Sequence, residues 1–193
     1  MIDENGWCKQ AESLLSPNHD SRPAGTRINL IVIHNISLPP RQYGGSFIAD
    51  LFLNRLDFDA HPYFNQLRAL RVSAHFLIRR DGKLIQFVSI NDRAWHAGVS
   101  DFQGRVQCND FSVGIEMEGS DHEPFTGLQY TILAELTAAL CVRYPITAVT
   151  GHEQIAPSRK TDPGPYFDWR RYEKDISALP ESRPLSFPKP VTR

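Results

Sequence analysis

A short, almost wholly apolar segment at residues 28–33, INLIVI, most constrains what this chain can fold into. Its β-branched side chains are typical of a strand that is buried on both faces of a sheet. His34 follows directly, so a titratable side chain is expected at the end of a central strand. Sites in α/β sheets usually lie at such strand ends.

Two other segments predict further strands. Residues 71–89 have the pattern of a hairpin, with Asp81-Gly82 as its tight turn. Residues 112–118 alternate strictly, as a strand does when its two faces meet different surroundings. One face carries Val113, Ile115 and Met117, and the other carries Gly114, Glu116 and Glu118.

Between residues 126 and 144 the apolar period becomes helical, with Thr126 as the N-cap. Pro145 ends this helix, residues 146–150 predict one more short strand, and a last helix starts near Asp168. Interleaved strands and helices predict a single domain of the α/β (α+β) class, with a central mixed β-sheet flanked by helices. One face of the longer helix carries Leu128, Ile132, Leu133, Leu136 and Leu140.

The last residues of the chain, 180–193, differ from the rest in composition. Four of the 14 prolines fall in this stretch, which has few apolar residues. Proline cannot continue a helix, and a segment poor in apolar residues cannot build a core. We therefore expect a folded domain at 1–179 and a proline-rich, flexible C-terminal tail at 180–193. An ordered strap lying over the surface is the alternative.

Composition excludes several classes of function. The chain carries 21 Lys and Arg against 22 Asp and Glu, so no strong field attracts nucleic acid or an anionic membrane. Every apolar run in the sequence is far shorter than the ~20 residues of a membrane span. No signal-peptide pattern is present at the N-terminus, and the three cysteines have no disulfide spacing. Free thiols and a cytoplasmic location are expected.

His34, His152 and Asp162 form the strongest candidate for a site. His152 follows the predicted strand at 146–150, and Asp162 lies ten residues later in a proline-rich loop. Two imidazoles and one carboxylate suit a catalytic zinc ion, which keeps its fourth position open for water. Packing histidines and a turn aspartate are the alternative, because no short metal-binding motif is present.

Hydrolysis at such a metal also requires a proton acceptor and a group that stabilises developing negative charge. Glu116 and Glu118 share a strand face and could supply the carboxylate. Lys160, two residues before Asp162, could supply the positive charge. A solvated strand face and an exposed loop lysine are the alternatives for these residues.

Several longer motifs resemble one known family. They are VIHNISLPP at 32–40, RVSAHFLIRRDG at 71–82, RAWHAGVS at 93–100, CNDFSVGIEMEG at 108–119 and TGHEQIAPSRKTDPGPYFDW at 150–169. Together they are similar to the 1,6-anhydro-N-acetylmuramyl-L-alanine amidases, the AmpD family, over about residues 6–175. That family belongs to a zinc amidase superfamily that also contains the peptidoglycan recognition proteins.

The resemblance implies a zinc amidase whose catalytic domain spans 1–179 and holds a single Zn²⁺ ion. Its reaction would cleave the amide between (1,6-anhydro)-N-acetylmuramic acid and the L-alanine of the stem peptide. By the same resemblance, His34, His152 and Asp162 would be the zinc ligands. Glu116 would be the catalytic carboxylate, and Lys160 would stabilise the oxyanion.

Substrate binding is implied for Asn35, Arg71, Trp95 and Arg105. Trp95 would offer a flat face to the sugar, and Arg71 a bidentate partner to a peptide carboxylate. The family pattern has a second arginine where this chain has Gln107. The expected partner is anhydro-muropeptide, with no nucleic acid and no membrane, and the chain is expected to be a monomer. Such activity would lower the muropeptide signal that induces β-lactamase.

Two other functions fit this sequence less well. A non-catalytic muropeptide-binding relative typically lacks a metal ligand, whereas this chain retains all three candidate ligands together with Glu116 and Lys160. A broad peptidoglycan amidase would act on the intact wall, which a cytoplasmic protein would not meet.

Overall fold

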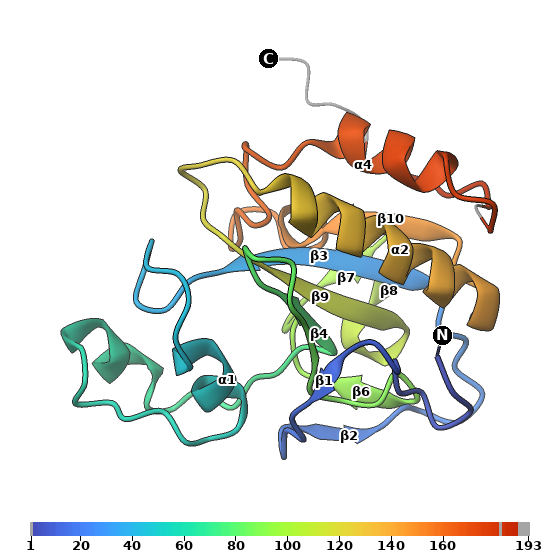
Figure 1. Ribbon diagram of the computed structural model, residues 1–193. Helices are drawn as coiled ribbons and strands as arrows, with labels where there is room; N and C mark the ends of the chain where they lie inside the picture. The colour runs from blue at the N-terminus through green and yellow to red at the C-terminus, as the bar shows by residue number, and fades with distance from the viewer. Residues whose placement is uncertain (1, 182, 189–193) are drawn as a thin grey trace.

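A six-stranded mixed sheet forms the centre of the computed structural model, which describes residues 2–181 and 183–188 (Figure 1). The strand order is β1-β5-β4-β9-β3-β10, and β4–β5 is the antiparallel pair of this sheet. The mixed sheet predicted from the sequence is therefore confirmed. The strands are β1 Glu12–Ser13, β3 Leu30–Ile36, β4 Phe76–Ile78, β5 Leu84–Gln86, β9 Ser112–Glu118 and β10 Ala148–Gly151.

The central strand β3 starts and ends later than its apolar pattern predicted. It begins at Leu30 and continues to Ile36, so His34 lies inside the strand and not at its end. The reason is the neighbouring strand, because β9 pairs with β3 without a break from Leu30 to Ile36. The predicted hairpin is present as β4 and β5, and Gly82 in its turn has a positive φ of 83° that glycine adopts without strain.

Two helices, α2 at Gly127–Arg143 and α4 at Trp169–Ser177, lie on one face of the sheet (Figure 1). Both begin where the sequence predicted. Thr126 Oγ1 accepts a hydrogen bond from the Gln129 amide, and Gln129 Oε1 accepts one from the Thr126 amide, which completes a capping box. Asp168 caps α4 through the amide of Arg171.

The main core lies between these helices and the sheet. Leu133, Leu136 and Leu140 of α2 pack there against Ile33 and Ile115 of the two central strands. Leu128 does not join them, contrary to expectation. It stands beside the hairpin turn at Gly82 and keeps 59% of its surface exposed, because the first turn of α2 directs Gln129 and Tyr130 inwards instead.

The opposite face of the sheet carries the alternate side chains of β3 and β9, among them His34 and Glu116. A second apolar cluster covers part of this face and includes Leu51 and Phe52 of α1 together with Phe64. The remaining elements are short. They are β2 His19–Ser21, α1 Phe47–Phe52, a 3-10 helix Pro62–Leu67, β6 Asp92–Ala94, β7 Asp101–Phe102, β8 Arg105–Val106, a 3-10 helix Cys108–Asp110 and α3 His152–Ile155.

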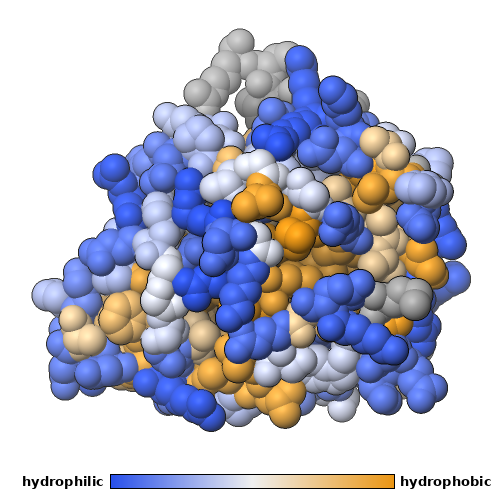
Figure 2. Space-filling model, viewed as in Figure 1, coloured by the Kyte–Doolittle hydropathy of each residue, from blue (hydrophilic) through white to orange (hydrophobic). Residues whose placement is uncertain are grey.

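The surface seen from the side of Figure 1 is mostly hydrophilic, with apolar residues gathered near its middle (Figure 2). Among the described residues, no helix combines the length and the apolar character that crossing a membrane requires. Cys8, Cys108 and Cys141 are buried and unpaired, which confirms the prediction of free thiols.

The described part of the predicted tail, residues 183–188, lies against the domain. Ser186 forms a parallel bridge with Ala148 of β10. The Val149 amide donates to the Ser186 carbonyl at 2.8 Å, and the Ser186 amide donates to the Thr147 carbonyl at 3.0 Å. These bonds occupy the outer edge of β10, which would otherwise expose unpaired backbone groups.

Side chains also hold this segment in place. Leu185 and Phe187 pack against the main core, and the ring of Phe187 meets the ring of Tyr172 edge-on at 5.7 Å. The prediction of a flexible tail is therefore wrong for residues 183–188, which form the alternative strap. The physical reason is that two apolar residues between the prolines outweigh the proline-rich composition. Residues 182 and 189–193 lie outside the described part of the chain.

We predict that deleting residues 183–193 lowers the melting temperature, whereas deleting 189–193 alone leaves it nearly unchanged. Partial burial of Leu185 and Phe187 stabilises the fold by about 1–3 kcal/mol. For a chain of this size each kcal/mol corresponds to about 2–4 °C. Thermal unfolding followed by circular dichroism checks the difference. Equal melting temperatures for the two truncated proteins would contradict the strap.

Candidate metal centre

The register of three parallel strands brings the candidate residues together. In the β3–β9 pair, His34 lies directly opposite Glu116. In the β3–β10 pair, Gly151 lies opposite Ile33, so the chain enters α3 with His152 next to His34. Parallel strands end at a common edge of the sheet, and the site lies at that edge.

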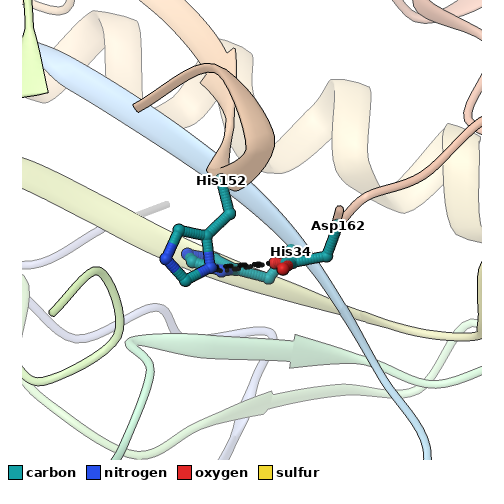
Figure 3. Close-up of side chains that lie close together, drawn as sticks. All are labelled: His34, His152 and Asp162. Atoms are coloured by element: carbon teal, nitrogen blue, oxygen red, sulfur yellow. Dashed lines mark hydrogen bonds and ion pairs between the residues drawn. The ribbon is translucent and has the colours of Figure 1, made fainter. Parts of the chain in front are cut away.

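The nearest polar atoms of His34, His152 and Asp162 converge on one point (Figure 3). The two Nδ1 atoms of the histidines lie 2.9 Å apart, and each lies 3.0 Å from Oδ2 of Asp162. Both histidine side chains are buried, and the aspartate is largely so. Three donor atoms of this kind form one face of the tetrahedron that zinc prefers.

A cation explains this geometry better than packing does. Two buried imidazole nitrogens that face each other across 2.9 Å need either a shared proton or an ion between them and the carboxylate. Two nitrogens and one carboxylate oxygen match a catalytic zinc site, in which the fourth position stays open. Among the described residues, His34, His152 and Asp162 are the one group of three side chains close enough together to hold a metal ion.

The electrostatics of His34 and Asp162 keep their donor atoms available. Burial is the largest influence on His34 and lowers its pKa to about 4, although the neighbouring Asp162 carboxylate acts in the opposite direction. Burial alone would raise the pKa of Asp162, but the adjacent imidazoles of His152 and His34 outweigh it and leave the pKa below its usual value. Neutral imidazole and ionised carboxylate are the forms that bind a metal.

The loop that carries Asp162 is fixed from two sides. The Glu153 amide donates to the Asp162 carbonyl at 2.8 Å. Asn35 Nδ2 donates to the Pro163 carbonyl at 3.1 Å and to Asp121 Oδ1 at 2.7 Å. Asn35 follows His34 on β3, so its side chain links this strand to the loop that carries Asp162. Both of its donor hydrogens are thus bonded to groups of the protein itself.

Glu116 is buried beside this group, and its Oε2 atom has no hydrogen-bond partner among the described residues. Burial raises its pKa well above the usual value, Asp162 raises it further, and Lys160 lowers it. An unpaired buried carboxylate is costly unless something else interacts with it, so this atom indicates a site for a polar or charged ligand.

Glu118 shares its strand face with Glu116 but has a different role. It is only 2% exposed, and its carboxylate accepts hydrogen bonds from the amides of Gly44 and Arg80. Arg79 lies 3.8 Å away as a further partner. Glu118 therefore anchors two loops, and the solvated strand face considered from the sequence is wrong for both glutamates.

A cavity of about 320 Å³ opens over the three candidate ligands. Lys160 and Trp95, both expected from the sequence, line it together with Asn35 and Glu116. Apolar and aromatic side chains to which no role was assigned from the sequence complete the wall, and these include Tyr63, Leu67 and Leu70. They come from the 3-10 helix at Pro62–Leu67 and the segment after it, which lacks the periodicity that would mark it as a site.

Two arginines expected to bind substrate lie elsewhere in this structure. The guanidinium of Arg71 donates to the carbonyls of Arg68 and Leu70, and Arg71 is not among the described residues that line the cavity. Arg105 stacks on the ring of Phe111 at 3.7 Å and donates to the side chain of Asn29.

Gln107 also stands apart from the cavity lining. It adopts a left-handed backbone conformation with φ of 59° as the N-cap of the short 3-10 helix at Cys108–Asp110. The motif spacing that suggested these positions contains no information on where the side chains turn.

His96 was not assigned to the site from the sequence, yet it lines the cavity and touches a candidate ligand. Its Nδ1 lies 2.9 Å from Nε2 of His34. Burial, and then the neighbouring His34, hold the pKa of His96 well below the usual value, so the ring is neutral. Its place directly after Trp95 was a usable signal, because adjacent residues of one loop reach the same cavity.

Several known proteins are similar to this chain in sequence and in fold. A family model described as N-acetylmuramoyl-L-alanine amidase matches residues 24–165. The 1,6-anhydro-N-acetylmuramyl-L-alanine amidase AmpD of Enterobacter cloacae is 53% identical over 174 residues, which are 89% of this chain and 93% of that protein. The crystal structure of a Se-Met AmpD derivative has a TM-score of 0.88 at 52% identity, covering 91% of this chain and 99% of that one.

A more distant solved structure contains a bound molecule. The N-acetylmuramyl-L-alanine amidase AmiD from Escherichia coli, in complex with the substrate anhydro-N-acetylmuramic acid-L-Ala-D-gamma-Glu-L-Lys, has a TM-score of 0.57 at 28% identity. The match covers 90% of this chain and 65% of that chain.

We predict that Asp162→Ala removes most of the metal from the purified protein, because two histidines alone leave the ion with too few ligands. Asp175→Ala, a change of a half-buried aspartate of α4 that pairs with Arg171, serves as the matched control and keeps the metal. Elemental analysis by inductively coupled plasma mass spectrometry measures the zinc content of each protein. Full zinc occupancy in Asp162→Ala would exclude this residue as a ligand.

Proposed function

This chain belongs to the N-acetylmuramoyl-L-alanine amidase family, and from that premise we propose how its residues carry out the reaction. It is an amidase that hydrolyses the amide between 1,6-anhydro-N-acetylmuramic acid and L-alanine, a step of cell-wall recycling. In this reaction water adds to the carbonyl carbon of the lactyl group. The carbon–nitrogen bond then breaks, and the amine of the stem peptide leaves with a proton.

The single observation that carries the proposal is the convergence of three donor atoms beside an unpartnered, buried carboxylate. His34, His152 and Asp162 would hold a zinc ion through the atoms that lie 2.9–3.0 Å from one another. When bound, the ion would polarise the substrate carbonyl and lower the pKa of water. The donor set leaves one side open, and the cavity lies on that side.

Glu116 is proposed as the group that moves the proton. Its free Oε2 faces no protein partner among the described residues and can accept a proton from the attacking water. The buried environment raises the pKa of this carboxyl above its usual value, so it can later donate the same proton to the leaving amine. A neighbouring dication would partly offset that rise.

Lys160 is proposed to stabilise the negative charge that develops on the carbonyl oxygen. The residue lines the cavity with the ligands, and its charge is near enough to affect the pKa values of both His34 and Glu116. A fixed positive charge at this place favours the tetrahedral state over the planar amide, which is the requirement for acceleration.

The substrate would lie in the cavity with its sugar near Trp95. The aromatic face and the neighbouring apolar wall suit a pyranose ring, and the Oδ1 atom of Asn35 can accept a hydrogen bond from the substrate. Arg71 would have to leave the carbonyls it now contacts before it could bind a peptide carboxylate. Arg105 is held on Phe111, and we assign it no contact with substrate in this structure.

We propose that the protein acts as a monomer in the cytoplasm. One chain supplies the three candidate ligands, Glu116 and the wall of a cavity over them, so the proposed reaction requires no residue from a second copy. The three free cysteines suit a reducing compartment, where the substrate would be recycled muropeptide. Removal of the stem peptide there would lower the muropeptide signal that induces β-lactamase.

Glu116→Gln is predicted to lower kcat by about 10²–10⁴-fold without loss of zinc, because the residue moves a proton and is not a ligand. Glu118→Gln is the matched variant on the same strand face. It should keep most of kcat and instead lower the melting temperature, since it loses one acceptor for a partly buried amide. Turnover, zinc content and thermal unfolding are measured on both proteins. Loss of activity in Glu118→Gln with nearly full activity in Glu116→Gln would contradict the assignment of Glu116 as the group that moves the proton.

We also predict faster hydrolysis of soluble anhydro-muropeptide than of intact peptidoglycan. The cavity of about 320 Å³ encloses a sugar and the start of a peptide more readily than a cross-linked strand. Release of the free L-alanine amine from the two substrates, at equal concentrations of muramyl-peptide linkages, gives the comparison. Equal or faster release from intact wall would favour the broad amidase, and binding without release would favour a binding module.

A further inference from the structure

The two candidate ligand histidines have engaged atoms on both sides of their rings. Each presents Nδ1 to the metal position, and each presents Nε2 to a neighbour in the loop after β6. His34 Nε2 lies 2.9 Å from His96 Nδ1, and His152 Nε2 lies 3.0 Å from the carbonyl oxygen of Ala97. Adjacent residues of one loop thus hold the outer nitrogens of both ligands.

The donor and the acceptor of each hydrogen bond can be assigned in order, from Ser112 to His96 and then to His34. Ser112 Oγ donates its proton to the Cys108 carbonyl at 2.6 Å, so towards His96 it can only accept. His96 Nε2 lies 3.3 Å from that oxygen and must be the protonated nitrogen of a neutral ring. The Nδ1 atom of His96 then carries a lone pair, which accepts the proton on Nε2 of His34.

We propose that His96 is a positioning residue that holds His34 in the tautomer and orientation required to bind the metal. This inference rests on the proposed function, because it takes His34 as a zinc ligand. With its proton on Nε2, His34 has a free lone pair on Nδ1, the atom that faces His152 and Asp162. A ligating histidine generally needs such a partner on its other nitrogen.

Removal of the acceptor would leave a buried N–H without a partner. His34 is almost fully buried, so water cannot replace His96 at little cost. The ring would then shift, or its proton would move to Nδ1 and oppose metal binding. His152 has no such dependence on a side chain, because its acceptor is a backbone carbonyl.

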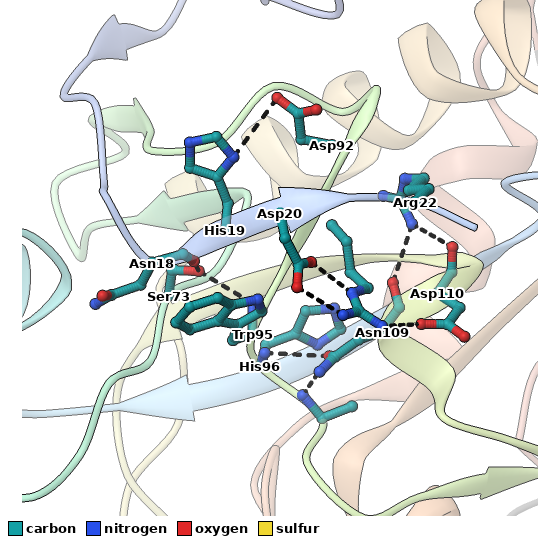
Figure 4. A network of polar contacts seen from close by, with 12 residues as sticks. Asn18, His19, Asp20, Arg22, Ser73, Asp92, Trp95, His96, Asn109 and Asp110 are labelled. Atoms are coloured by element: carbon teal, nitrogen blue, oxygen red, sulfur yellow. Dashed lines mark hydrogen bonds and ion pairs between the residues drawn. The ribbon is translucent and has the colours of Figure 1, made fainter. Parts of the chain in front are cut away.

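Two features of the surrounding structure hold His96 in place. Asn109 Oδ1 accepts hydrogen bonds from the amides of both His96 and Ala97, at 3.2 and 2.8 Å (Figure 4). Gly114 on β9 lies under the imidazole, and a Cβ atom at this position would overlap the ring. His96 can therefore occupy this place only if residue 114 is glycine.

The test is the zinc affinity of the full-length protein, measured by competition with a chromogenic chelator. We expect His96→Phe to bind zinc about 10–100-fold more weakly than the wild type, because Phe fills the space but accepts no hydrogen bond. His96→Asn should recover most of the affinity, since its Oδ1 atom takes the place of Nδ1. His19→Phe, a change of an exposed histidine on β2, is the control and should bind zinc as the wild type does.

Gly114→Ala provides a second variant that keeps every polar group of the site. It should weaken zinc binding in the same direction as His96→Phe, because its methyl group displaces the ring. Melting temperatures of the zinc-free proteins identify any variant that is not folded, and affinities are compared among folded proteins.

The possible outcomes separate the two levels of the argument. A wild-type protein that binds no zinc would contradict the proposed function itself. Wild-type zinc binding with unchanged affinity in His96→Phe would overturn the role of His96 alone. The role of His96 would also be overturned if His96→Asn bound zinc as weakly as His96→Phe. Acceptance of a hydrogen bond from His34 would then not determine the affinity.

Discussion

The site depends on the parallel pairing of β3 with its two neighbours. This pairing places His34 opposite Glu116 and brings His152 in at the start of α3. A shift of one residue in either ladder would turn a side chain towards the core under α2. The apolar residues that alternate with the functional ones prevent such a shift, because Ile33 and Ile115 are fully buried on the other face. Core packing and site geometry are thus two consequences of one register.

Around that register, loops of the chain complete and support the candidate metal position. The loop after α3 supplies Asp162 and Lys160, and Asn35 binds it to β3. The loop after β6 supplies Trp95 to the cavity, and its residues His96 and Ala97 contact the outer nitrogens of the two candidate ligand histidines. The rigid sheet therefore carries His34 and Glu116, whose positions must be precise. Loops held by hydrogen bonds supply the other residues of the site.

The sequence was sufficient for the class of fold and for the expectation that His34, His152 and Asp162 lie together. It was insufficient for contacts that depend on three-dimensional arrangement. Apolar period and capping residues predicted the strands and helices, because burial determines both. Register and side-chain direction have no such local signal. Arg71 and Arg105 match motif positions but turn to other partners, and His96 acts through a neighbour 62 residues away. Leu185 and Phe187 escaped notice because a proline-rich composition hid two apolar contacts.

The central claim is that zinc is bound by two histidine nitrogens and one aspartate oxygen at the edge of the parallel strands. Anomalous diffraction from a crystal of the purified protein, recorded on both sides of the zinc absorption edge, tests it most directly. A single strong peak is expected about 2.0–2.2 Å from Nδ1 of His34, Nδ1 of His152 and a carboxylate oxygen of Asp162. A peak ligated by cysteine sulfur, or no peak between these three residues in zinc-containing protein, would contradict the account.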